Sequence, residues 1–457
     1  MRIISFYFIL LFSITLFGQD YIQNVSGNVV LKGDFSEKTN AKSGKLYLYE
    51  ILGHSEYLLD SAIVQSGQFG FRSRTFITGV YRLAFNNATN HVDIVVNPSE
   101  SNELDIKFHN YRIKKGYNIV NSVENKIKKL YTKKEGSIKS KIKSIQKSQK
   151  TRDLKLQEMR NLQFELFQYG VDLHNENPGT YYGMIISHMQ SPYNEVQHLY
   201  FNDIDFTDEC IVRSGLLPHR IQTYIQSFND YKNNPYGFHD AVDVVMEYAK
   251  KNEKVAEFCM YNMLDGFYNT GQTQTKNDAI WMNLCNYIMD EYIFGEGCGD
   301  DINPSELLKE RASQYKNLQI GHIPPDIYAR DMGGKAINLR KTCLNNKYTV
   351  LMFWASHCNH CMNELPGFST WYAQNKNLDF EIIAVSLDSQ KSKWESTVNT
   401  NNFNWINICE FKVYKSPICL DYKIKKTPTF FVLNKQMEIV AKPKSTHQLR
   451  SFLLSNK

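Results

Sequence analysis

Alternation of apolar and polar side chains predicts strands in the first part of the chain. Short runs of this kind recur at intervals of roughly ten residues, with glycines and Asn97-Pro98 between them as turns. The clearest runs are residues 45–49, 81–85, 92–96 and 104–108. Many short strands separated by turns are typical of a small sandwich. We therefore predict an all-β, sandwich-like module over residues 20–110.

After residue 110 the apolar positions recur at helical intervals, as in Ile127, Leu130, Ile138 and Ile142. This spacing predicts an α-helical region over residues 111–317.

From residue 318 the pattern changes again, to strands alternating with helices. Continuous apolar runs predict buried strands, and amphipathic stretches between them predict helices. The strands are expected at residues 348–353, 380–385 and 429–433, and the helices at 359–375, 391–400 and 445–454. Elements in this order predict an α/β sheet covered on both faces over residues 318–457. The fold class is thus multidomain: β-rich, then helical, then α/β.

The first 19 residues read as a signal peptide rather than as part of the fold. Arg2 supplies a positive charge, residues 3–17 are almost entirely apolar, and Gly18-Gln19 end the run. The apolar run of about 15 residues is short for a membrane span, which takes about 20. A short N-terminal anchor is the alternative. We expect cleavage, export to the periplasm or cell envelope, and no membrane span in the mature protein.

Composition is that of a globular protein, with 42% hydrophobic and 22% charged residues among 457. Charge is uneven: residues 111–160 contain 16 Lys+Arg and four acidic residues, a local charge of +12 in a chain of net +6. A basic helix can bind an anionic partner, or it can be a solvated helix whose lysine stems cover an apolar seam. Because export is expected, no nucleic-acid partner is predicted.

The candidate reactive residues are one pair of cysteines. Of nine cysteines, only Cys358-Asn359-His360-Cys361 forms a tightly spaced pair. It lies between the buried run ending at Trp354 and a helical stretch, so it should begin a helix. Free N–H groups and the helix dipole there favour a thiolate on Cys358, and Cys361 lies one turn further on. The spacing predicts a dithiol that can close into a disulfide.

Zinc sites use the same spacing but need a second pair of ligands. No second CxxC, CxxH or HxxxH occurs in the sequence, so no metal is predicted. A dithiol carries two electrons itself, so no diffusible cofactor is predicted either. For Cys409 and Cys419 the sequence leaves two readings open, an accessory disulfide or two buried thiols.

The stretch from Phe353 to Pro366 resembles the active-site segment of exported thioredoxin-like thiol–disulfide oxidoreductases of the TlpA/ResA type. Residues 321–326 look like the family's N-terminal hairpin, and Lys426-Thr427-Pro428 like its cis-proline loop. The resemblance covers residues 318–457. It implies a thioredoxin-like fold, a redox pair Cys358–Cys361 and substrate docking at Thr427, Pro428 and Trp354. The stretch from Leu59 to Phe71 resembles the β-rich N-terminal module that precedes exported thioredoxin-like domains in Bacteroidota, and the helical region resembles the helical spacer of the same proteins.

Two positions depart from related patterns, His357 and Met352. His357 stands directly before Cys358, where the family often has Trp. Met352 stands where thioredoxin has a buried Asp, so proton handling must differ; the resemblance implies Glu364 as the proton carrier. His360, between the cysteines, is predicted to stabilise the Cys358 thiolate by a hydrogen bond or by charge.

Three functions compete at this stage. The leading one is thiol–disulfide exchange with protein thiols and disulfides of the cell envelope, together with a redox donor or acceptor. The second is a redox-inactive envelope binding or assembly protein with a vestigial thioredoxin domain. The third is a thiol peroxidase, but its Pro-x-x-x-Thr/Ser-x-x-Cys pattern is absent, since Leu351 and Ala355 precede Cys358 at those offsets.

Overall fold

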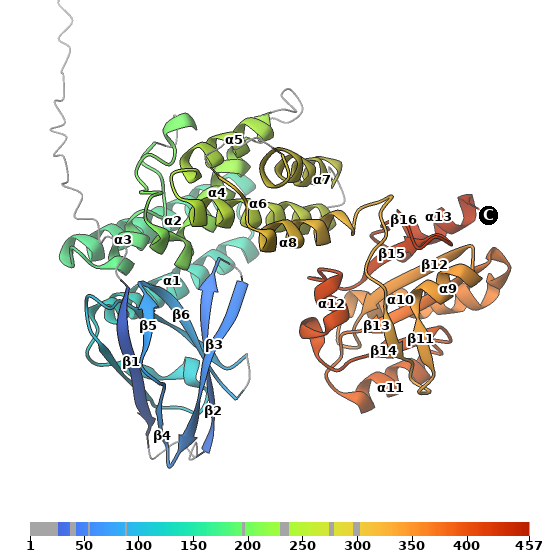
Figure 1. The fold of residues 1–457 in the computed structure, drawn as a ribbon, viewed down its shortest axis with the longest axis horizontal. Helices are drawn as coiled ribbons and strands as arrows, with labels where there is room; N and C mark the ends of the chain where they lie inside the picture. Colours follow the sequence, from blue (N-terminus) through green and yellow to red (C-terminus); the bar gives the residue numbers. More distant parts are fainter. Residues whose placement is uncertain are drawn as a thin grey trace, which may run out of the picture. The chain divides into compact units, whose positions relative to one another are not determined.

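The computed structural model divides into two units, residues 1–226 and residues 227–457 (Figure 1). It describes residues 26–36, 43–53, 55–86, 89–193, 197–228, 237–273, 278–295 and 302–456. The predicted signal peptide lies outside the described residues. The predicted domain boundaries at residues 110 and 317 stay predictions.

The first unit opens with a β-rich sheet, as the alternating pattern predicts. Its strands are β1 (Ser26–Phe35), β2 (Ser43–Leu52), β3 (Ser55–Gln65), β4 (Gln68–Gly70), β5 (Arg74–Ile77), β6 (Gly79–Phe85), β7 (His91–Val96), β8 (Glu103–Phe108) and β9 (Tyr117–Ile119). They form one connected sheet in the order β7-β6-β2-β3-β4-β1-β8-β9, with β5 paired to β1. The β-rich character predicted for this module is confirmed, whereas its sandwich-like arrangement stays a prediction; β1 connects the sheet by pairing with β4, β5 and β8 along its length.

Alternation explains how this sheet builds its core. In β8 the side chains of Leu104, Ile106 and Phe108 are at most 1% exposed, whereas those between them are partly exposed. Successive side chains of a strand point to opposite faces, so one face of β8 enters the core and the other meets solvent. Residues from all the longer strands join the same cluster.

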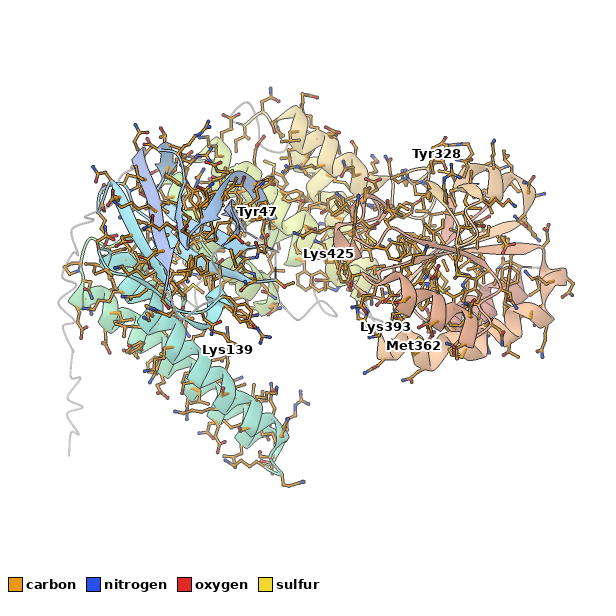
Figure 2. All side chains as sticks on the ribbon, turned by 90° about the horizontal axis from the view of Figure 1, so that it is seen from below. Tyr47, Lys139, Tyr328, Met362, Lys393 and Lys425 are labelled. Atoms are coloured by element: carbon orange, nitrogen blue, oxygen red, sulfur yellow. The ribbon has the colours of Figure 1, made fainter. Side chains whose placement is uncertain are left out.

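Helices follow the sheet in the first unit. They are η1 (Ile113–Lys115), α1 (Val123–Lys147), α2 (Arg152–Glu176), α3 (Tyr181–Ser187), η2 (Gln197–Leu199), η3 (Glu209–Arg213) and α4 (Leu216–Ser227). The basic segment forms α1 and the start of α2, and side chains such as Lys139 extend from α1 (Figure 2). Lys134 pairs with Glu165 at 2.6 Å, which ties α1 to α2.

A buried carboxylate joins sheet and helices within this unit. Glu124 accepts hydrogen bonds from the backbone N–H groups of Tyr181 and Tyr182, at 2.7 and 2.8 Å, and from the Asn97 amide at 2.8 Å. Burial raises the pKa of Glu124, and the three donors oppose that effect. The carboxylate thereby caps α3 and holds it to the end of β7.

The second unit begins with helices and ends with the predicted α/β sheet. The helices before the sheet are α5 (Gly237–Ala249), α6 (Glu253–Thr273), α7 (Asp278–Tyr287), the π-helix η4 (Ile288–Ile293) and α8 (Glu306–Lys316). Within the described ranges, no helix has the length and apolar character needed to cross a bilayer.

The α/β part of this unit contains a five-stranded sheet in the order β14-β13-β12-β15-β16 and a β10-β11 hairpin. Its elements are β10 (Tyr328–Arg330), β11 (Ala336–Asn338), α9 (Leu339–Asn345), β12 (Tyr348–Trp354), α10 (Asn359–Gln374), η6 (Lys376–Leu378), β13 (Phe380–Ser386), α11 (Lys391–Thr400), β14 (Ile406–Cys409), η7 (Val413–Lys415), α12 (Pro417–Asp421), β15 (Thr429–Leu433), β16 (Ile439–Ala441) and α13 (Thr446–Ser455). The central strand β12 is parallel to β13 and antiparallel to β15.

Both faces of β12 are buried, which explains its unbroken apolar run. On one face Val350 and Met352 join the cluster that includes Leu365 of α10 and Leu449 of α13. On the other face Phe353 contacts the ring of Tyr422 at 5.5 Å between centroids. The sheet is therefore fixed on both sides, and the chain leaves β12 from a rigid base.

Candidate active site

Cys358 occupies the N-cap of α10, four residues after β12 ends. Its sulfur accepts a hydrogen bond from the backbone N–H of Cys361 at 3.2 Å. The thiol donates to the carbonyl oxygen of Thr427 at 3.4 Å. The Thr427-Pro428 peptide is cis, as the loop motif predicted. The fold thus brings together a helix start and a loop 69 positions later in the chain.

The two thiols differ in exposure and in acidity. Cys358 is half-buried, and burial alone would raise its pKa. Hydrogen bonds from the side chains of Cys361 and Thr427 and from the backbone N–H groups of Cys361 and His360 outweigh burial and lower that pKa. Cys361 is fully buried, and burial together with the nearby Cys358 sulfur raises its pKa. Cys358 is therefore the accessible thiol that ionises readily, and Cys361 is the protected partner.

Tyr414 is a residue of this site that the sequence analysis missed. It lies in η7, and burial raises its pKa, with a further contribution from Cys358 and an opposing hydrogen bond to Thr427. Nothing in the sequence near Tyr414 resembles a motif. Its proximity to Cys358 and Thr427 arises only because the fold brings η7 to the Thr427-Pro428 loop.

Asp388 is the second residue that was missed, and it anchors the loop before Cys358. Its side chain is buried and accepts hydrogen bonds from Ser356 N–H at 3.0 Å, Ser356 Oγ at 2.6 Å and Ser386 Oγ at 2.7 Å. His357 Nδ1 lies 3.4 Å from Asp388 Oδ1. One sequence signal was available: Asp388 lies two residues after the end of the buried strand β13, whose carboxyl end lies beside that of β12.

His360 and Glu364 face each other on the first turns of α10. The His360 Nδ1 atom lies 3.3 Å from Glu364 Oε1, and the His360 side chain is 63% exposed. Glu364 also accepts hydrogen bonds from the backbone N–H and the hydroxyl of Thr446, at 2.9 and 3.0 Å. The contact of His360 that lowers the pKa of Cys358 is its backbone N–H. The catalytic roles predicted for His360 and Glu364 remain predictions.

Trp354 is the last residue of β12. It is fully buried, and its ring packs edge-on against Phe403 at 5.3 Å between centroids. The substrate contact predicted for Trp354 stays a prediction, and in this structure its side chain packs in the core. Met352, where thioredoxin has an Asp, is also fully buried in the same cluster.

Cys409 and Cys419 lie elsewhere in the α/β part of the described chain. Cys409 and Cys419 are separate thiols, as are Cys358 and Cys361, and Cys409 donates to the backbone carbonyl of Asp388 at 3.5 Å. In the ranges that the structure describes, no cluster of three or more His, Cys, Asp or Glu side chains is arranged to hold a metal ion.

A sulfur that ionises readily, a protected second thiol one turn away and a cis-proline loop facing both define a thiol–disulfide oxidoreductase of the thioredoxin type. Comparison with known proteins agrees. A protein family described as thioredoxin-like matches residues 345–439. This part of the chain is TlpA/ResA-like.

Two curated relatives and one solved structure illustrate the similarity. The thiol-disulfide oxidoreductase ResA of Bacillus cereus is 28% identical over 149 residues, which span 30% of this chain and 79% of ResA. Sporulation thiol-disulfide oxidoreductase A of Bacillus subtilis is 28% identical over 91 residues, 20% of this chain and 55% of that protein. A thioredoxin-like protein from Bacteroides caccae is 16% identical with a TM-score of 0.36, and the match covers 57% of this chain and 92% of that one.

Proposed function

We propose that the protein is an exported thiol–disulfide oxidoreductase that exchanges electrons with protein thiols and disulfides through Cys358 and Cys361. The observation that carries the proposal is the position of Cys358: its sulfur accepts the N–H of Cys361 and faces the Thr427 carbonyl at the cis-proline loop. Export is inferred from the apolar run at residues 3–17. Protein substrates in the cell envelope follow from that location and from the thiol–disulfide activity in the names of the relatives.

In the reducing direction, the Cys358 thiolate attacks one sulfur of a substrate disulfide. That S–S bond breaks, one substrate cysteine leaves as a thiolate, and a mixed disulfide forms on Cys358. Cys361 then gives up its proton and attacks the Cys358 sulfur, which releases the second substrate cysteine as a thiol and closes the Cys358–Cys361 disulfide. Two electrons pass to the substrate, and a dithiol of a redox partner restores the pair by the reverse steps.

This chemistry requires no diffusible cofactor, because the two sulfurs carry the electrons. We propose Glu364 as the group that relays the Cys361 proton, because it lies three residues after Cys361 in α10. Thr427 and Pro428 are proposed to dock the substrate backbone, since the Thr427 carbonyl already faces the attacking sulfur.

A trapping experiment tests the assignment of the two cysteines. With Cys361→Ser the mixed disulfide cannot be resolved, so attack of Cys358 on the disulfides of oxidised insulin, without added dithiothreitol, should leave insulin chains bound to Cys358. With Cys358→Ser, and with both cysteines replaced, no adduct should form. Wild-type protein should accelerate insulin precipitation by dithiothreitol, and all three variants should not. Equal trapping by the two single variants would overturn the assignment.

A further inference from the structure

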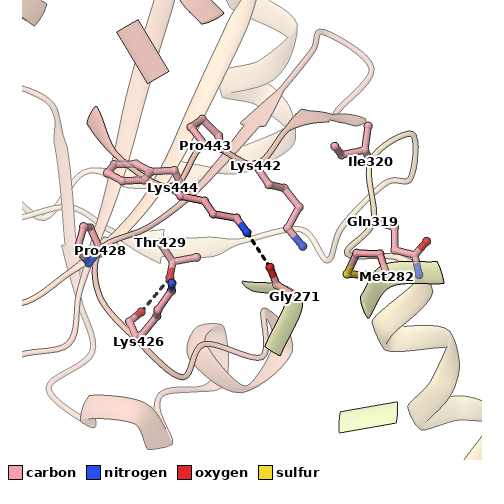
Figure 3. Close-up of a pocket in the computed structure, with 11 residues that line it drawn as sticks. Gly271, Met282, Gln319, Ile320, Lys426, Pro428, Thr429, Lys442, Pro443 and Lys444 are labelled. Carbon is pink, nitrogen blue, oxygen red and sulfur yellow. Dashed lines mark hydrogen bonds between the residues drawn. The ribbon is translucent and has the colours of Figure 1, made fainter. Parts of the chain in front are cut away.

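A pocket of about 370 Å³ adjoins the cis-proline loop within residues 227–457 (Figure 3). The residues that line it are Gly271, Met282, Gln319, Ile320, Lys426, Pro428, Thr429, Phe430, Lys442, Pro443 and Lys444. Pro428 and Thr429 directly follow Thr427, whose carbonyl oxygen faces Cys358. The pocket therefore borders the loop whose Thr427 carbonyl faces the reacting sulfur.

Three lysines contribute to this lining, and none of the described residues that line it is acidic. They come from two segments: Lys426 precedes the cis-proline peptide, and Lys442 and Lys444 follow β16. The Lys442 ammonium donates to the Leu318 carbonyl at 3.1 Å and to the Tyr268 hydroxyl at 3.3 Å, and Lys444 donates to the Gly271 carbonyl at 2.8 Å. Neutral oxygens thus hold these two ammonium groups in place.

These charges are close together and partly removed from water. Burial lowers the pKa of Lys426, and the nearby Lys444 lowers it further. Burial lowers the pKa of Lys442 to about 8, again with a contribution from Lys444. Ammonium groups that repel one another and have lost hydration interact strongly with an incoming anion. The pocket is built to favour negative charge.

We propose that this pocket binds an acidic side chain of the polypeptide whose disulfide Cys358 attacks. The inference rests on the proposed function and adds a substrate preference to it. A polypeptide is favoured over a free small anion because the lining is continuous with the Thr427-Pro428 loop. A chain docked there can place the side chain of a residue near its reactive cysteine into the pocket, since neighbouring residues advance by only about 3.3 Å. The volume of about 370 Å³ accommodates one Asp or Glu side chain with part of its backbone.

The test compares two synthetic disulfide peptides that are identical except that glutamates beside the reactive cysteine are replaced by glutamines. Single-turnover reduction is measured with the reduced full-length protein at low ionic strength. We expect the glutamate peptide to react about tenfold faster, the ratio that one charge-assisted hydrogen bond supplies. Lys426→Gln should lower this ratio several-fold, and Lys426→Gln combined with Lys442→Gln should bring it to about one.

Lys425→Gln is the matched control. Lys425 is exposed, precedes Lys426 directly and does not line the pocket, so its removal changes the net charge equally. It should leave the ratio at the wild-type value. A purely structural effect of the Lys426 and Lys442 substitutions would slow both peptides alike and keep the ratio, which would overturn the inference.

Two further outcomes separate the inference from the proposed function. If wild-type protein reduces both peptides at the same rate, the pocket inference is overturned while the proposed function stands. If it reduces neither peptide, nor the small neutral disulfide bis(2-hydroxyethyl) disulfide, the proposed function fails and the inference falls with it. An equal loss of preference in Lys425→Gln would assign the effect to general surface charge and would also overturn the inference.

Discussion

Replacing Asp388 by Ala should destabilise the α/β part of the chain and slow exchange at Cys358. The side chain is 3% exposed, and it accepts three hydrogen bonds from Ser356 and Ser386. Removing the carboxylate leaves these donors without their partner in a buried site. Ser356 lies two residues before Cys358, so the loop that carries the reactive sulfur loses its anchor.

The expected cost follows from those three contacts. A buried donor left without its acceptor costs about 1–3 kcal/mol, and bonds to a charged acceptor are at the upper end. Such costs are not fully additive, because the loop can relax and water can enter. We expect Asp388→Ala to lower the free energy of unfolding by about 3–5 kcal/mol. Asp388→Asn keeps one acceptor oxygen and should cost less, about 1–2 kcal/mol.

Urea denaturation of the full chain, followed by tryptophan fluorescence, measures this loss. Of the five tryptophans, four lie in the α/β part, at positions 354, 371, 394 and 405, so the signal reports mainly on that part. The exposed Asp421, changed to Ala, is the control and should stay within about 0.5 kcal/mol of wild type. A loss below about 1 kcal/mol for Asp388→Ala at an unchanged urea slope would refute the reasoning.

Three other predictions follow from the described contacts. Alkylation of the reduced protein should modify Cys358 before Cys361. Because the pKa of Cys358 is lowered, the rate of Cys358 alkylation should reach half its maximum at a lower pH in the folded protein than in the urea-unfolded chain. Coincident pH profiles of the two forms would contradict the assignment. Glu364→Ala removes the hydrogen-bond acceptor at the start of α13 and should lower the free energy of unfolding by about 1–2 kcal/mol in the same urea assay. Glu364→Gln keeps an acceptor oxygen and should lose less stability. If Glu364 also carries the proton, the thiol–disulfide exchange rate of Glu364→Gln should fall although its stability is nearly kept. Glu124→Ala leaves the N–H groups of Tyr181 and Tyr182 unpaired and should lower the melting temperature of the first unit by several degrees. Melting is followed by far-ultraviolet circular dichroism, and an unchanged melting curve would refute this structural role of Glu124.

Local sequence was sufficient to predict a feature when all the residues that define it lie in one short segment. The apolar run of β12 followed by Cys358-Asn359-His360-Cys361 predicted a strand that turns into a helix, and the structure has Cys358 at the N-cap of α10. The three buried strands of the α/β part were likewise predicted, because strands buried on both faces require continuous apolar runs.

Local sequence was insufficient where a side chain's surroundings come from elsewhere in the chain. Trp354 belongs to the same apolar run as its neighbours, and only the packing of Phe403 against it shows that it lies in the core. The helical spacing of four residues brings the His360 ring to Glu364, a contact that the sequence analysis did not consider. The single connected sheet of the first unit also depends on β1 pairing with strands distant in sequence.

The sequence by itself determined the chemistry of this protein: a dithiol, a helix start to acidify one sulfur, and a proline loop of recognisable pattern. The tertiary structure decided what surrounds that dithiol. Asp388, Tyr414 and the lysine-lined pocket reach the Cys358 loop or the Thr427-Pro428 loop only because strands and connections distant in sequence end at neighbouring places in the fold. The physical reason is that backbone direction and local burial are encoded residue by residue, whereas hydrogen bonds and charge clusters between segments exist only after packing is complete.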